Sequence, residues 1–496
     1  MARLQVQAAR RQDKTVKLSR MHLDANSKDF TQSSIDCDIA IVGSGPAGII
    51  LAEQFKNTKY QVCVLESGGF EPDAETQRLA EGSLQAPTPA LDNNYISQHS
   101  VRHFGGTGSV WGGYCRQLDE VDFEQRDLPF AHQWPISKKE LLPFYPWHAI
   151  EGKVDTKNID NTALQVKYYE RVLYPFDALL KNLFVDDTNI RLILHASVTD
   201  LIQQSSGSLA HLNVVSGNHK NFQVKAKVYV LACGGIGNVK ILLNANGVDK
   251  NGVGNTHDQV GRHFMEHPHF QFFGPPALLW LADKRADWLF HNERYKPTFS
   301  FTHEKMRAEK LLNFSAQPSN AFEDGYKGAG ANLYRPNFKN LSGKKTEGAF
   351  YAMAFRAEQA PNPDSRVTLT TEKDALGLRR VHLNWQLGDA DKTSLFRSIH
   401  LLAEELGKTS MGRVRLMLDD NAPWQTMVGG GHLMGTTRMS EKPEDGVVDK
   451  NCQVHGKDNL FIAGSSVFAS SGVANPTLTI MALSRRLAAH LKEVLA

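Results

Sequence analysis

The stretch between residues 37 and 66 constrains the fold of this chain more than any other part of the sequence. An apolar run of strand length, residues 37–42, leads into Gly43-Ser-Gly-Pro-Ala-Gly48. A helical segment, 49–55, and a second apolar run, 61–65, follow, and the second run ends at Glu66. Strand, GxGxxG turn, helix, strand and acid in this order form the dinucleotide-binding βαβ unit. The sequence therefore predicts an α/β fold with a Rossmann-like sheet.

Each glycine of this turn has its own physical task. Gly43 makes the tight turn, Gly45 lets the backbone approach a pyrophosphate at the helix N-terminus, and Gly48 lets the helix pack closely on the strand. Glu66 can accept hydrogen bonds from ribose hydroxyls, and its charge disfavours the 2′-phosphate of NADP. The unit binds FAD or NAD, so the turn alone leaves that choice open. The predicted cofactor-binding residues here are Gly43, Gly45, Pro46, Ala47, Gly48, Glu66 and Ser67.

A second glycine cluster, residues 102–113, reads Arg-His-Phe-Gly-Gly-Thr-Gly-Ser-Val-Trp-Gly-Gly. So many glycines disfavour a helix or strand interior, and they let the backbone lie flat against a large planar or phosphate-bearing ligand. A flexible linker is the alternative, but the interspersed Phe104, Val110 and Trp111 argue against a solvated spacer. The residues predicted to contact the cofactor here are Arg102, Gly106, Thr107, Gly108, Ser109, Trp111, Gly112 and Gly113.

The chain returns to the nucleotide-binding domain twice. Residues 228–232 are expected to form a buried strand that runs into a glycine turn at Cys233 and a helix over 238–243. Residues 460–466 are expected to form a strand that ends in a turn of small residues. Such returns suit a large dinucleotide held from two sides. The cofactor-binding residues predicted from them are Val198, Ala232, Cys233, Gly234, Gly464 and Ser465.

The segments between these returns predict a substrate domain. Residues 164–184 are expected to be helical, and 211–215 with 222–230 to form a hairpin. Residues 349–355 and 381–386 resemble strands, and 389–406 have the periodicity of an amphipathic helix. We therefore expect a substrate domain that carries a sheet and one or two helices.

Length and composition limit the number of domains, the partners and the compartment of this protein. The chain has 496 residues, of which 41% are hydrophobic, and this size favours two domains. A formal net charge of +3 with both signs mixed gives no support for a nucleic-acid partner. No apolar run approaches the roughly 18 residues of a membrane span. Five scattered cysteines without a CxxC favour a cytoplasmic protein. The basic N-terminal stretch is interpreted as a solvated or partner-bound arm rather than a targeting signal.

Residues 260–269 contain His263, Glu266, His267 and His269, a spacing at which a metal site is conceivable. Pro268, however, interrupts any helix that would place the first two histidines on one face. We therefore expect these histidines to have a structural role and predict no metal site.

Two polar residues near the C-terminus stand among glycines and small side chains. His432 begins His-Leu-Met-Gly-Thr-Thr-Arg-Met, and Asn475 precedes Pro476 and Thr477 at the start of a predicted helix. Proline suits the first position of a helix, so Asn475 should stand beside unpaired backbone N–H groups and a positive helix dipole. This arrangement suits an electron-rich group next to a titratable base. The predicted catalytic residues are His432 and Asn475, and Asn475, Pro476 and Thr477 are also predicted to contact the cofactor.

Together, these motifs resemble the glucose–methanol–choline (GMC) oxidoreductase family over nearly the whole chain, from residue 36 onward. The resemblance rests on their order, with Trp134-Pro135, residues 261–268 and residues 362–369 between the glycine loops and the C-terminal pair. It implies a Rossmann-like FAD-binding domain interleaved with a substrate domain built on an antiparallel sheet. It also implies FAD as the cofactor and alcohols as substrates.

The C-terminal pair is most similar to the branch of pyranose 2-oxidases and of the sugar or sugar-acid dehydrogenase flavosubunits. Pyranose oxidases attach FAD covalently through a histidine just before a tryptophan in the glycine loop. Val110 stands at that place before Trp111, so the resemblance implies noncovalent FAD.

The resemblance and the changes in sequence texture divide the chain as follows. Residues 1–34 form the arm. The FAD-binding domain comprises residues 35–120, 189–268 and 425–496, and the substrate domain comprises residues 121–188 and 269–424. We expect His432 to act as the base that takes a hydroxyl proton while the hydride goes to flavin N5. Asn475 is expected to donate a hydrogen bond to the developing alkoxide.

The substrate is expected to be a small molecule, a sugar or glycoside, and the electron acceptor O2, a quinone or a redox protein. A homo-oligomer is compatible with the sequence. Three alternatives remain open: the flavin subunit of a sugar or sugar-acid dehydrogenase complex that passes electrons to a cytochrome, an FAD-containing lyase of the same fold, and a non-enzymatic FAD-bound module.

Overall fold

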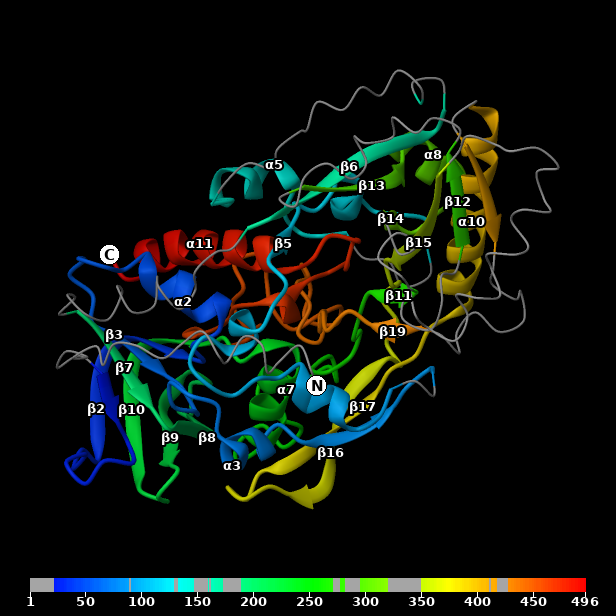
Figure 1. Ribbon diagram of the computed structural model, residues 1–496. Helices are drawn as coiled ribbons and strands as arrows, with labels where there is room; N and C mark the ends of the chain where they lie inside the picture. The colour runs from blue at the N-terminus through cyan, green and yellow to red at the C-terminus, as the bar shows by residue number, and fades with distance from the viewer. Residues whose placement is uncertain are drawn as a thin grey trace.

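Two sheet-bearing regions lie side by side in the fold, and the last segment of the chain runs between them (Figure 1). The structure, a computed structural model, describes residues 22–88, 91–128, 133–146, 159, 162–172, 189–270, 277–281, 295–319, 349–409, 412–416 and 427–496. Every statement below concerns these residues.

The first sheet is the parallel sheet that the βαβ unit predicts. Residues 39–42, 62–65, 228–231 and 460–462 of this sheet are buried and apolar, as expected for strands covered on both faces. The parallel strands lie in the order β1 (His22–Asp24), β7 (Ile190–Leu194), β3 (Val62–Leu65), β2 (Ser34–Val42), β10 (Asn221–Leu231) and β20 (Leu460–Ile462). The antiparallel strands β9 (Leu209–Ser216) and β8 (Ala196–Gln203) extend the sheet from β10 and confirm the predicted hairpin.

Three helices accompany this sheet and bring the glycine turns to it. Helix α2 (Pro46–Glu53) follows the GxGxxG turn, and α7 (Gly234–Asn244) follows the second return of the chain. The C-terminal helix α11 (Thr477–Val494) packs beside α2, as Figure 1 shows. The predicted fold class, a Rossmann-like domain with a second sheet-bearing domain, is therefore confirmed.

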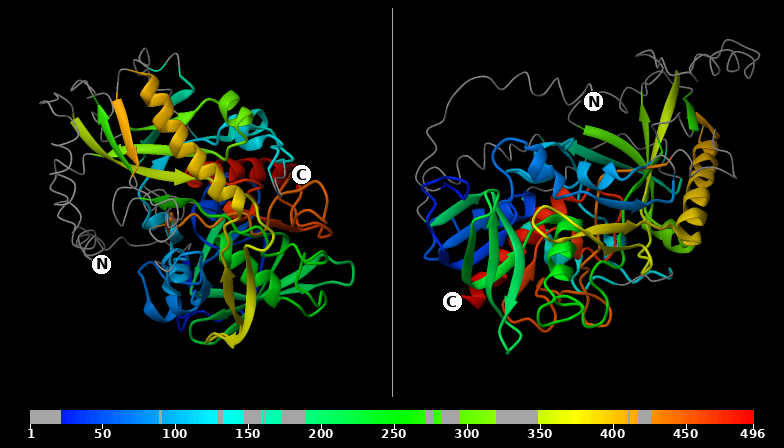
Figure 2. Two further views of the ribbon diagram at one scale, coloured as in Figure 1. Left: turned by 90° about the vertical axis from the view of Figure 1, so that its right-hand side faces the viewer. Right: turned by 90° about the horizontal axis from the view of Figure 1, so that it is seen from below.

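The second sheet has nine strands, and all its pairs are antiparallel. Its main path runs β18 (Gly412–Leu416), β12 (Ala277–Leu281), β15 (Ala349–Ala357), β14 (Phe314–Ser319), β13 (Tyr295–Phe301), β6 (Leu164–Arg171) and β5 (Tyr114–Cys115), and β11 (Pro268–Phe270) with β19 (Val428–Gly429) attaches at β15. The long helix α10 (Asp389–Lys408), which the sequence predicted, lies along this sheet beside β18 (Figure 2).

The two faces of this sheet differ in chemistry. One face carries Phe299, Phe355 and Phe270, which are buried and continue the hydrophobic core. The opposite face, here named the polar face, carries His269, Arg356 and Ser315, which are direct neighbours across β11, β15 and β14. Tyr169 belongs to the polar face, and its hydroxyl donates to the carbonyl of Val473 at 2.7 Å. The polar face is therefore turned toward the C-terminal segment that carries Asn475.

A small third sheet and several short helices complete the described part. The sheet consists of β16 (Arg366–Lys373), β17 (Arg379–Asn384) and β4 (Gly82–Gln85). The short helices are α3 (Ala74–Arg78), α4 (Asn94–Gln98), η1 (Gly106–Ser109), η2 (Glu120–Phe123), α5 (Lys138–Leu141), η3 (Leu142–Phe144), α8 (His303–Ala308) and η6 (Ser465–Val467).

Several expectations about single elements were wrong. Residues 164–171, predicted as helix, form strand β6, because Leu164-Gln-Val-Lys alternates apolar and polar residues with the period of a strand. The remainder of that predicted helix, 173–184, lies outside the described residues. Helix α7 starts at Gly234 rather than at 238.

Pieces of the chain also cross the boundaries expected between the domains. The expected N-terminal arm is partly built into the fold, since residues 22–24 pair with β7 as strand β1. Tyr114 and Cys115 leave the second glycine loop and join the substrate sheet as β5. Strand β4 pairs with β17 across the same expected boundary.

Candidate active site

The first glycine turn has the shape that its sequence predicts. Gly43 has a φ of +105°, and a Cβ there would stand 2.6 Å from the carbonyl oxygen of Ala232. A Cβ on Gly48 would stand 2.0 Å from the carbonyl oxygen of Gly43, so only glycine lets α2 begin this close to the turn. A Cβ on Gly45 would meet no protein atom within 4 Å. The turn thus presents bare backbone at Gly45, between Gly43 and Pro46 and Ala47 at the start of α2.

The second glycine loop lies directly against the first. The N–H of Gly105 donates to the carbonyl of Ser44 at 3.2 Å, and a Cβ on Gly106 would stand 3.1 Å from the Cα of Gly45. Within the loop, the Ser109 hydroxyl donates to the carbonyl of Gly106 at 2.8 Å, which closes η1. The structure therefore brings together two glycine loops that stand about sixty residues apart in the sequence. Thr107, Gly108, Trp111, Gly112 and Gly113 follow in the same loop.

Glu66 is buried and holds the first turn in place. Its carboxylate accepts from the N–H and hydroxyl of Ser44 at 3.1 and 2.6 Å. It also accepts from the hydroxyl of Ser67 at 3.1 Å and the N–H of Gly68 at 3.0 Å. A carboxylate offers about four acceptor positions, so these bonds fill them. A ribose hydroxyl at Glu66 would take the place of the Ser44 or Ser67 hydroxyl.

Two further features fit a large phosphate-bearing cofactor at this place. The Nε of Arg102 is buried and has no hydrogen-bond partner among the described residues. Gly234, with a φ of +76°, opens α7 onto space in which a Cβ would meet no protein atom within 4 Å. Cys233 is the N-cap of α7, next to Ala232. These residues fit the pyrophosphate and adenosine portions of a dinucleotide.

Other residues predicted to bind the cofactor have mainly structural contacts in the described part of the chain. Val198 lies in β8 and is buried. Gly464 has a φ of +121°, and Ser465 donates from its hydroxyl to the carbonyl of Leu433 at 2.7 Å, close to His432. Pro476 caps α11, and Thr477 is the first residue of that helix.

His432 is held by a buried carboxylate that the sequence reasoning had assigned to a structural group. The N–H groups of Gly431 and His432 donate to Glu266, both at 2.8 Å, and the N–H of His267 donates to the same carboxylate at 2.8 Å. The hydroxyl of Tyr95 donates to it as well. Burial raises the pKa of Glu266 to about 7, whereas the four donors favour its charged form. The loop before His432 is thus fixed by one carboxylate.

The ring of His432 is joined to a second histidine whose own partner is a carbonyl. Nδ1 of His432 lies 2.8 Å from Nδ1 of His267, and Nε2 of His267 lies 3.3 Å from the carbonyl oxygen of Ser471. A carbonyl only accepts, so Nε2 of His267 carries the proton. The neutral His267 ring must then accept at Nδ1, so His432 donates from Nδ1. The other nitrogen of His432, Nε2, is left with a free lone pair.

The surroundings keep these rings neutral. Burial lowers the pKa of His267 to about 4, and burial together with His267, His269 and Arg356 lowers the pKa of His432 well below its usual value. Burial, with Arg356 next, also lowers the pKa of His269 strongly. The ring centroids of His269 and His432 are 5.9 Å apart. His432 is therefore a neutral imidazole at neutral pH, with Nε2 able to take a proton.

Asn475 stands one residue before the cap of α11, at the helix mouth that the sequence predicted. Its amide nitrogen donates to the carbonyl of Tyr114 at 3.0 Å. Because a carbonyl only accepts, this bond fixes which end of the amide is nitrogen. Among the described residues, the second N–H and the side-chain carbonyl of Asn475 make no hydrogen bond that holds the fold. The same segment, residues 471–475, thus carries the partner of His267 and the predicted second catalytic residue.

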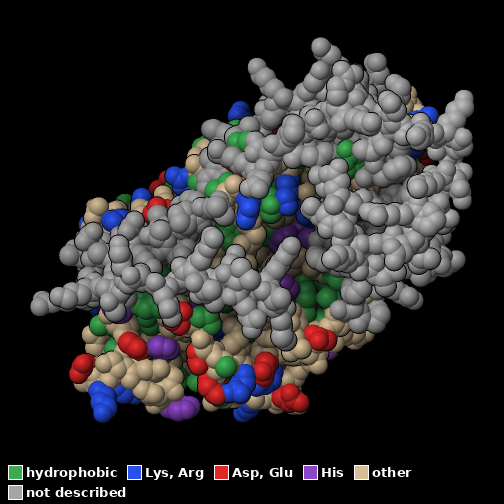
Figure 3. All heavy atoms as spheres, in the orientation of Figure 1, with side chains coloured by type: hydrophobic (Ala, Val, Ile, Leu, Met, Phe, Trp, Pro, Cys, Tyr) green, Lys and Arg blue, Asp and Glu red, His purple; other side chains and the backbone are tan. Residues whose placement is uncertain are grey.

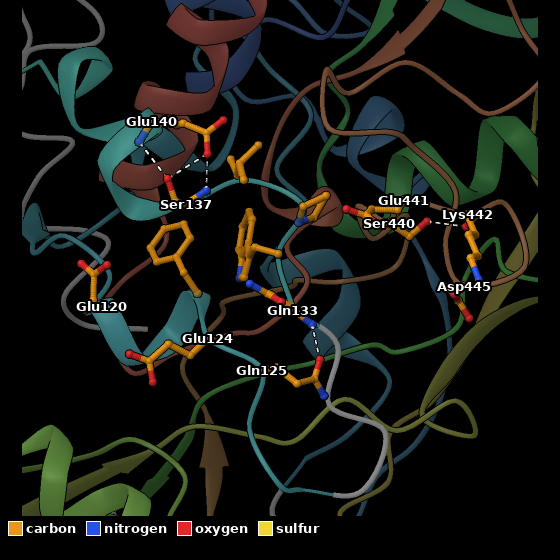
Figure 4. A pocket seen from close by; sticks show the side chains of 14 residues that line it. Glu120, Glu124, Gln125, Gln133, Ser137, Glu140, Ser440, Glu441, Lys442 and Asp445 are labelled. Carbon is orange, nitrogen blue, oxygen red and sulfur yellow. Dashed lines mark hydrogen bonds between the residues drawn. The ribbon is translucent and has the colours of Figure 1, made fainter.

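A cavity in the described part of the chain lies away from these residues. It has a volume of about 520 Å³ and opens beside η2, α5 and the loop 440–445, as Figure 4 shows. Trp134 in its wall donates from Nε1 to the hydroxyl of Ser470 at 2.9 Å. None of the predicted cofactor-binding or catalytic residues lines it. Its lining consists of Glu120, Phe123, Glu124, Gln125, Gln133, Trp134, Pro135, Ile136, Ser137, Glu140, Ser440, Glu441, Lys442 and Asp445.

Sequence reasoning missed the residues that support His432. The pattern of residues 260–269 suggests a structural role for Glu266 and His267, and no motif points to Tyr95 or Ser471 as partners of this site. The available signal was the segment 261–268, which belongs to the motif set of the resemblance. In the described residues no three His, Cys, Asp or Glu side chains converge as metal ligands, and no helix is long and apolar enough to cross a membrane.

Comparison with known proteins shows which family model and which proteins this chain resembles. The family model for GMC oxidoreductases, in its C-terminal part, matches residues 361–484. The chain is 27% identical to the fructose dehydrogenase large subunit of Gluconobacter japonicus, over 92% of this chain and 98% of that protein. It is 28% identical to the 6'''-hydroxyparomomycin C oxidase of Streptomyces lividus, over 92% of each chain.

A similar fold is found among solved structures. The pyridoxine 4-oxidase of Mesorbium loti superposes with a TM-score of 0.62 at 16% identity, and covers 92% of this chain and 99% of that one. The fold and the site define a flavin-dependent oxidoreductase. Residues 361–484 match the C-terminal domain of GMC oxidoreductases, the two relatives named above are similar to this chain over 92% of its length, and the cofactor is FAD.

Proposed function

We propose that this enzyme oxidises a CH–OH group of a sugar or glycoside to a carbonyl and that His432 is the base. The observation that carries the proposal is the chain from the Ser471 carbonyl through His267 to His432. It fixes a neutral imidazole with a free Nε2, and it begins at Ser471, four residues before Asn475. A base that is neutral at working pH is what removal of a hydroxyl proton requires.

The named relatives support a sugar-like substrate. They are the fructose dehydrogenase large subunit and the 6'''-hydroxyparomomycin C oxidase; the chain is also 21% identical to the paromamine 6'-oxidase of Streptomyces fradiae, and a 142-residue stretch is 32% identical to a C-glycoside 3-oxidase of Microbacterium trichothecenolyticum. These names describe compounds with several hydroxyl groups on rings. The sequence-based placement near the sugar-oxidising branch of the family agrees with this substrate class.

In the proposed mechanism, bound FAD supplies a hydride acceptor for the carbon that is oxidised. His432 takes the hydroxyl proton at Nε2, and its Nδ1–H stays bonded to His267. Asn475, whose amide is oriented by the Tyr114 carbonyl, uses its remaining N–H to hold the substrate oxygen. Glu266 keeps the backbone of His432 in place while the His432 ring becomes cationic.

The substrate class is tested by anaerobic flavin bleaching. Hexoses, glycosides, polyols and non-sugar alcohols are mixed with the FAD-loaded protein, and the loss of flavin absorbance is followed. We expect sugars or glycosides to bleach the flavin fastest. Turnover of a substrate without bleaching would favour the lyase alternative instead.

A second candidate, the flavin subunit of a dehydrogenase complex, is favoured by the likeness to a fructose dehydrogenase large subunit. Oxygen consumption measured against dye or quinone reduction with the same substrate separates the two. Fast dye reduction with little oxygen consumption supports the dehydrogenase, whose partner would be a redox protein or a quinone.

We also propose that FAD is bound noncovalently, because Val110 stands where a covalent histidine would be needed and its side chain is 46% exposed. Acid precipitation of the protein should release all the flavin into the supernatant. Flavin that stays with the precipitate would contradict this.

A further inference from the structure

A row of polar side chains on the polar face of the substrate sheet lacks partners. His269, Arg356 and Ser315 lie opposite one another across β11, β15 and β14. Ser300, on β13, adjoins the pair Phe299–Ala316 and continues the row. In the described part, His269 Nε2, Arg356 Nε, Ser315 Oγ and Ser300 Oγ are buried without a hydrogen-bond partner. Buried polar groups are normally paired, so four neighbouring exceptions point to a missing ligand.

Arg356 is the charged member of this row. No described carboxylate forms an ion pair with it, and its guanidinium carbon lies 5.7 Å from the centre of the Tyr169 ring. A buried guanidinium without a counter-charge is unfavourable, because the lost hydration is not replaced. Burial accordingly lowers the pKa of Arg356. A bound anion would supply the counter-charge that Arg356 lacks.

Two further cationic side chains of this sheet lie against the ring of Tyr114, on the edge strand β5. Lys296 lies 3.9 Å and Arg171 5.9 Å from the centre of the Tyr114 ring, and neither has an ion-pair partner among the described residues. Lys167, on the same face, is neutralised by Asp119 at 2.7 Å. Figure 3 shows Lys and Arg side chains beside histidines in the middle of the molecule's face. Lys296 and Arg171 therefore add positive charge at this edge of the sheet.

The position of Arg356 relates this charge to the reaction. Directly opposed residues in a sheet have Cβ atoms roughly 5 Å apart, so Arg356 is one strand from His269. His269 in turn lies 5.9 Å from His432, ring centre to ring centre. A molecule that places a CH–OH group at His432 and an anionic group at Arg356 spans a few carbon atoms.

We propose that the substrate is a polyhydroxylated compound with an oxyanion group, a carboxylate or a phosphate, and that Arg356 binds this group. The inference rests on the proposed function, since it names the substrate class of the same site. Arg356 is a specificity-determining residue, and Ser315 and Ser300 offer further hydrogen bonds in its row. A guanidinium is suited to this task because it binds oxyanions through two parallel N–H groups.

The test compares pairs of compounds with the same carbon skeleton. The FAD-loaded protein is mixed anaerobically with a six-carbon aldonate and its polyol, and with a hexose phosphate and its hexose. The rate of flavin bleaching is measured against concentration. We expect one anionic member to exceed its neutral counterpart by about tenfold or more in rate constant over dissociation constant. The two pairs distinguish a carboxylate from a phosphate.

The variants Arg356→Met and Arg356→Lys are compared with Arg413→Met, which changes an exposed arginine on the edge strand β18 of the same sheet. Arg356→Met should lose the preference for the anion by roughly tenfold to hundredfold. Arg356→Lys should retain part of it, because the charge remains, and Arg413→Met should retain all of it. If Arg356→Met does not fold, as judged by circular dichroism, Arg356→Lys carries the comparison, and an anion preference equal to that of the parent protein overturns the proposal. A parent protein that prefers the neutral compounds overturns it in any case.

Two readouts do not depend on turnover. Calorimetric titration of the protein with the aldonate or with inorganic phosphate should show binding that Arg356→Met abolishes. The flavin reduction potential should be the same in the variant and the parent. A shifted potential with an unchanged substrate preference would mean that Arg356 acts on the flavin, and would overturn the proposal.

The two hypotheses fail in different ways. If neutral sugars bleach the flavin and anions neither bind nor react better, the anion site is wrong and the proposed function stands. If anions bind through Arg356 but no polyhydroxylated compound bleaches the flavin, the proposed function is wrong.

Discussion

The turn at Gly43–Gly48 and the site around His432 are built in opposite ways. In the turn, six consecutive residues create the site with their backbone, and a residue of the same turn excludes a side chain at Gly48, where a Cβ would stand 2.0 Å from the carbonyl oxygen of Gly43. Around His432, the contacts come from residues 95, 266, 267 and 471, which only the fold brings together. A short motif can therefore reveal the first site, whereas the second depends on long-range contacts.

The largest expected effect comes from the assembled site. His432→Ala should lower the rate of anaerobic flavin reduction by about 10²–10⁴-fold, because it removes the group that takes the hydroxyl proton. FAD content should stay unchanged, since the turn that holds the cofactor is elsewhere. The measurement is stopped-flow bleaching with saturating substrate, with the flavin-to-protein ratio as control. Reduction at the parent rate would show that His432 is not the base.

A substitution in the turn at Gly43–Gly48 should have the opposite effect and weaken FAD binding. Gly45→Val places a side chain over bare backbone where no protein atom stands within 4 Å, so the fold should survive while FAD affinity falls by at least tenfold. Gly247→Val is a matched control, because its Cβ also meets nothing within 4 Å and it lies away from both glycine loops. Flavin titration of the apoproteins measures the affinity. Equal affinity in the two variants would remove Gly45 from the cofactor site.

The link between the two histidines offers a finer test. In His267→Asn the side-chain oxygen can replace Nδ1 as acceptor for His432, whereas in His267→Gln the amide nitrogen replaces Nε2 as donor to Ser471 and the acceptor is lost. We expect the Gln variant to reduce flavin about tenfold more slowly than the Asn variant, with a similar dissociation constant for the substrate.

The protonated nitrogen of His432 can also be observed directly in these variants. Nitrogen-15 spectra of histidine-labelled protein should show Nδ1 of His432 protonated in the parent and a mixture of tautomers in His267→Gln. The signals of His432 are identified by their absence in His432→Ala. Equal rates and equal spectra in the two variants would contradict the role given to His267.

The smallest expected effect concerns pH. Burial and neighbouring cationic or histidine groups lower the pKa of His432 well below its usual value, so its neutral, basic form persists below pH 6.5. The rate of flavin reduction should therefore stay level as pH falls from 8 to 6.5, and should decline only when pH approaches the lowered pKa. The groups that set this pKa are His267, His269, Arg356 and His99. If the rate of flavin reduction falls with a midpoint at or above pH 6.5, the lowered pKa of His432 is contradicted.

Much of the fold followed from local patterns. The strand, turn and helix after residue 37 were predicted because each apolar run and each glycine has a short-range meaning. Helix α10 was predicted because its apolar residues repeat with the helical period. Strand β6 was mistaken for helix because its eight residues are few and its pairing partner β13 lies more than a hundred residues further along the chain.

The sequence by itself determined the dinucleotide turn, the second glycine loop and the identity of His432 and Asn475 as unusual polar residues among small ones. Tertiary structure alone decided that Glu266 holds the loop of His432 and that His267 orients the His432 ring. It also decided that Arg356 stands without a counter-charge on the strand next to His269. The physical reason is the distance along the chain between the residues that determine each property. Backbone geometry is set by the residues next in the chain, whereas the protonation and the charge balance of a side chain are set by whatever the fold packs against it.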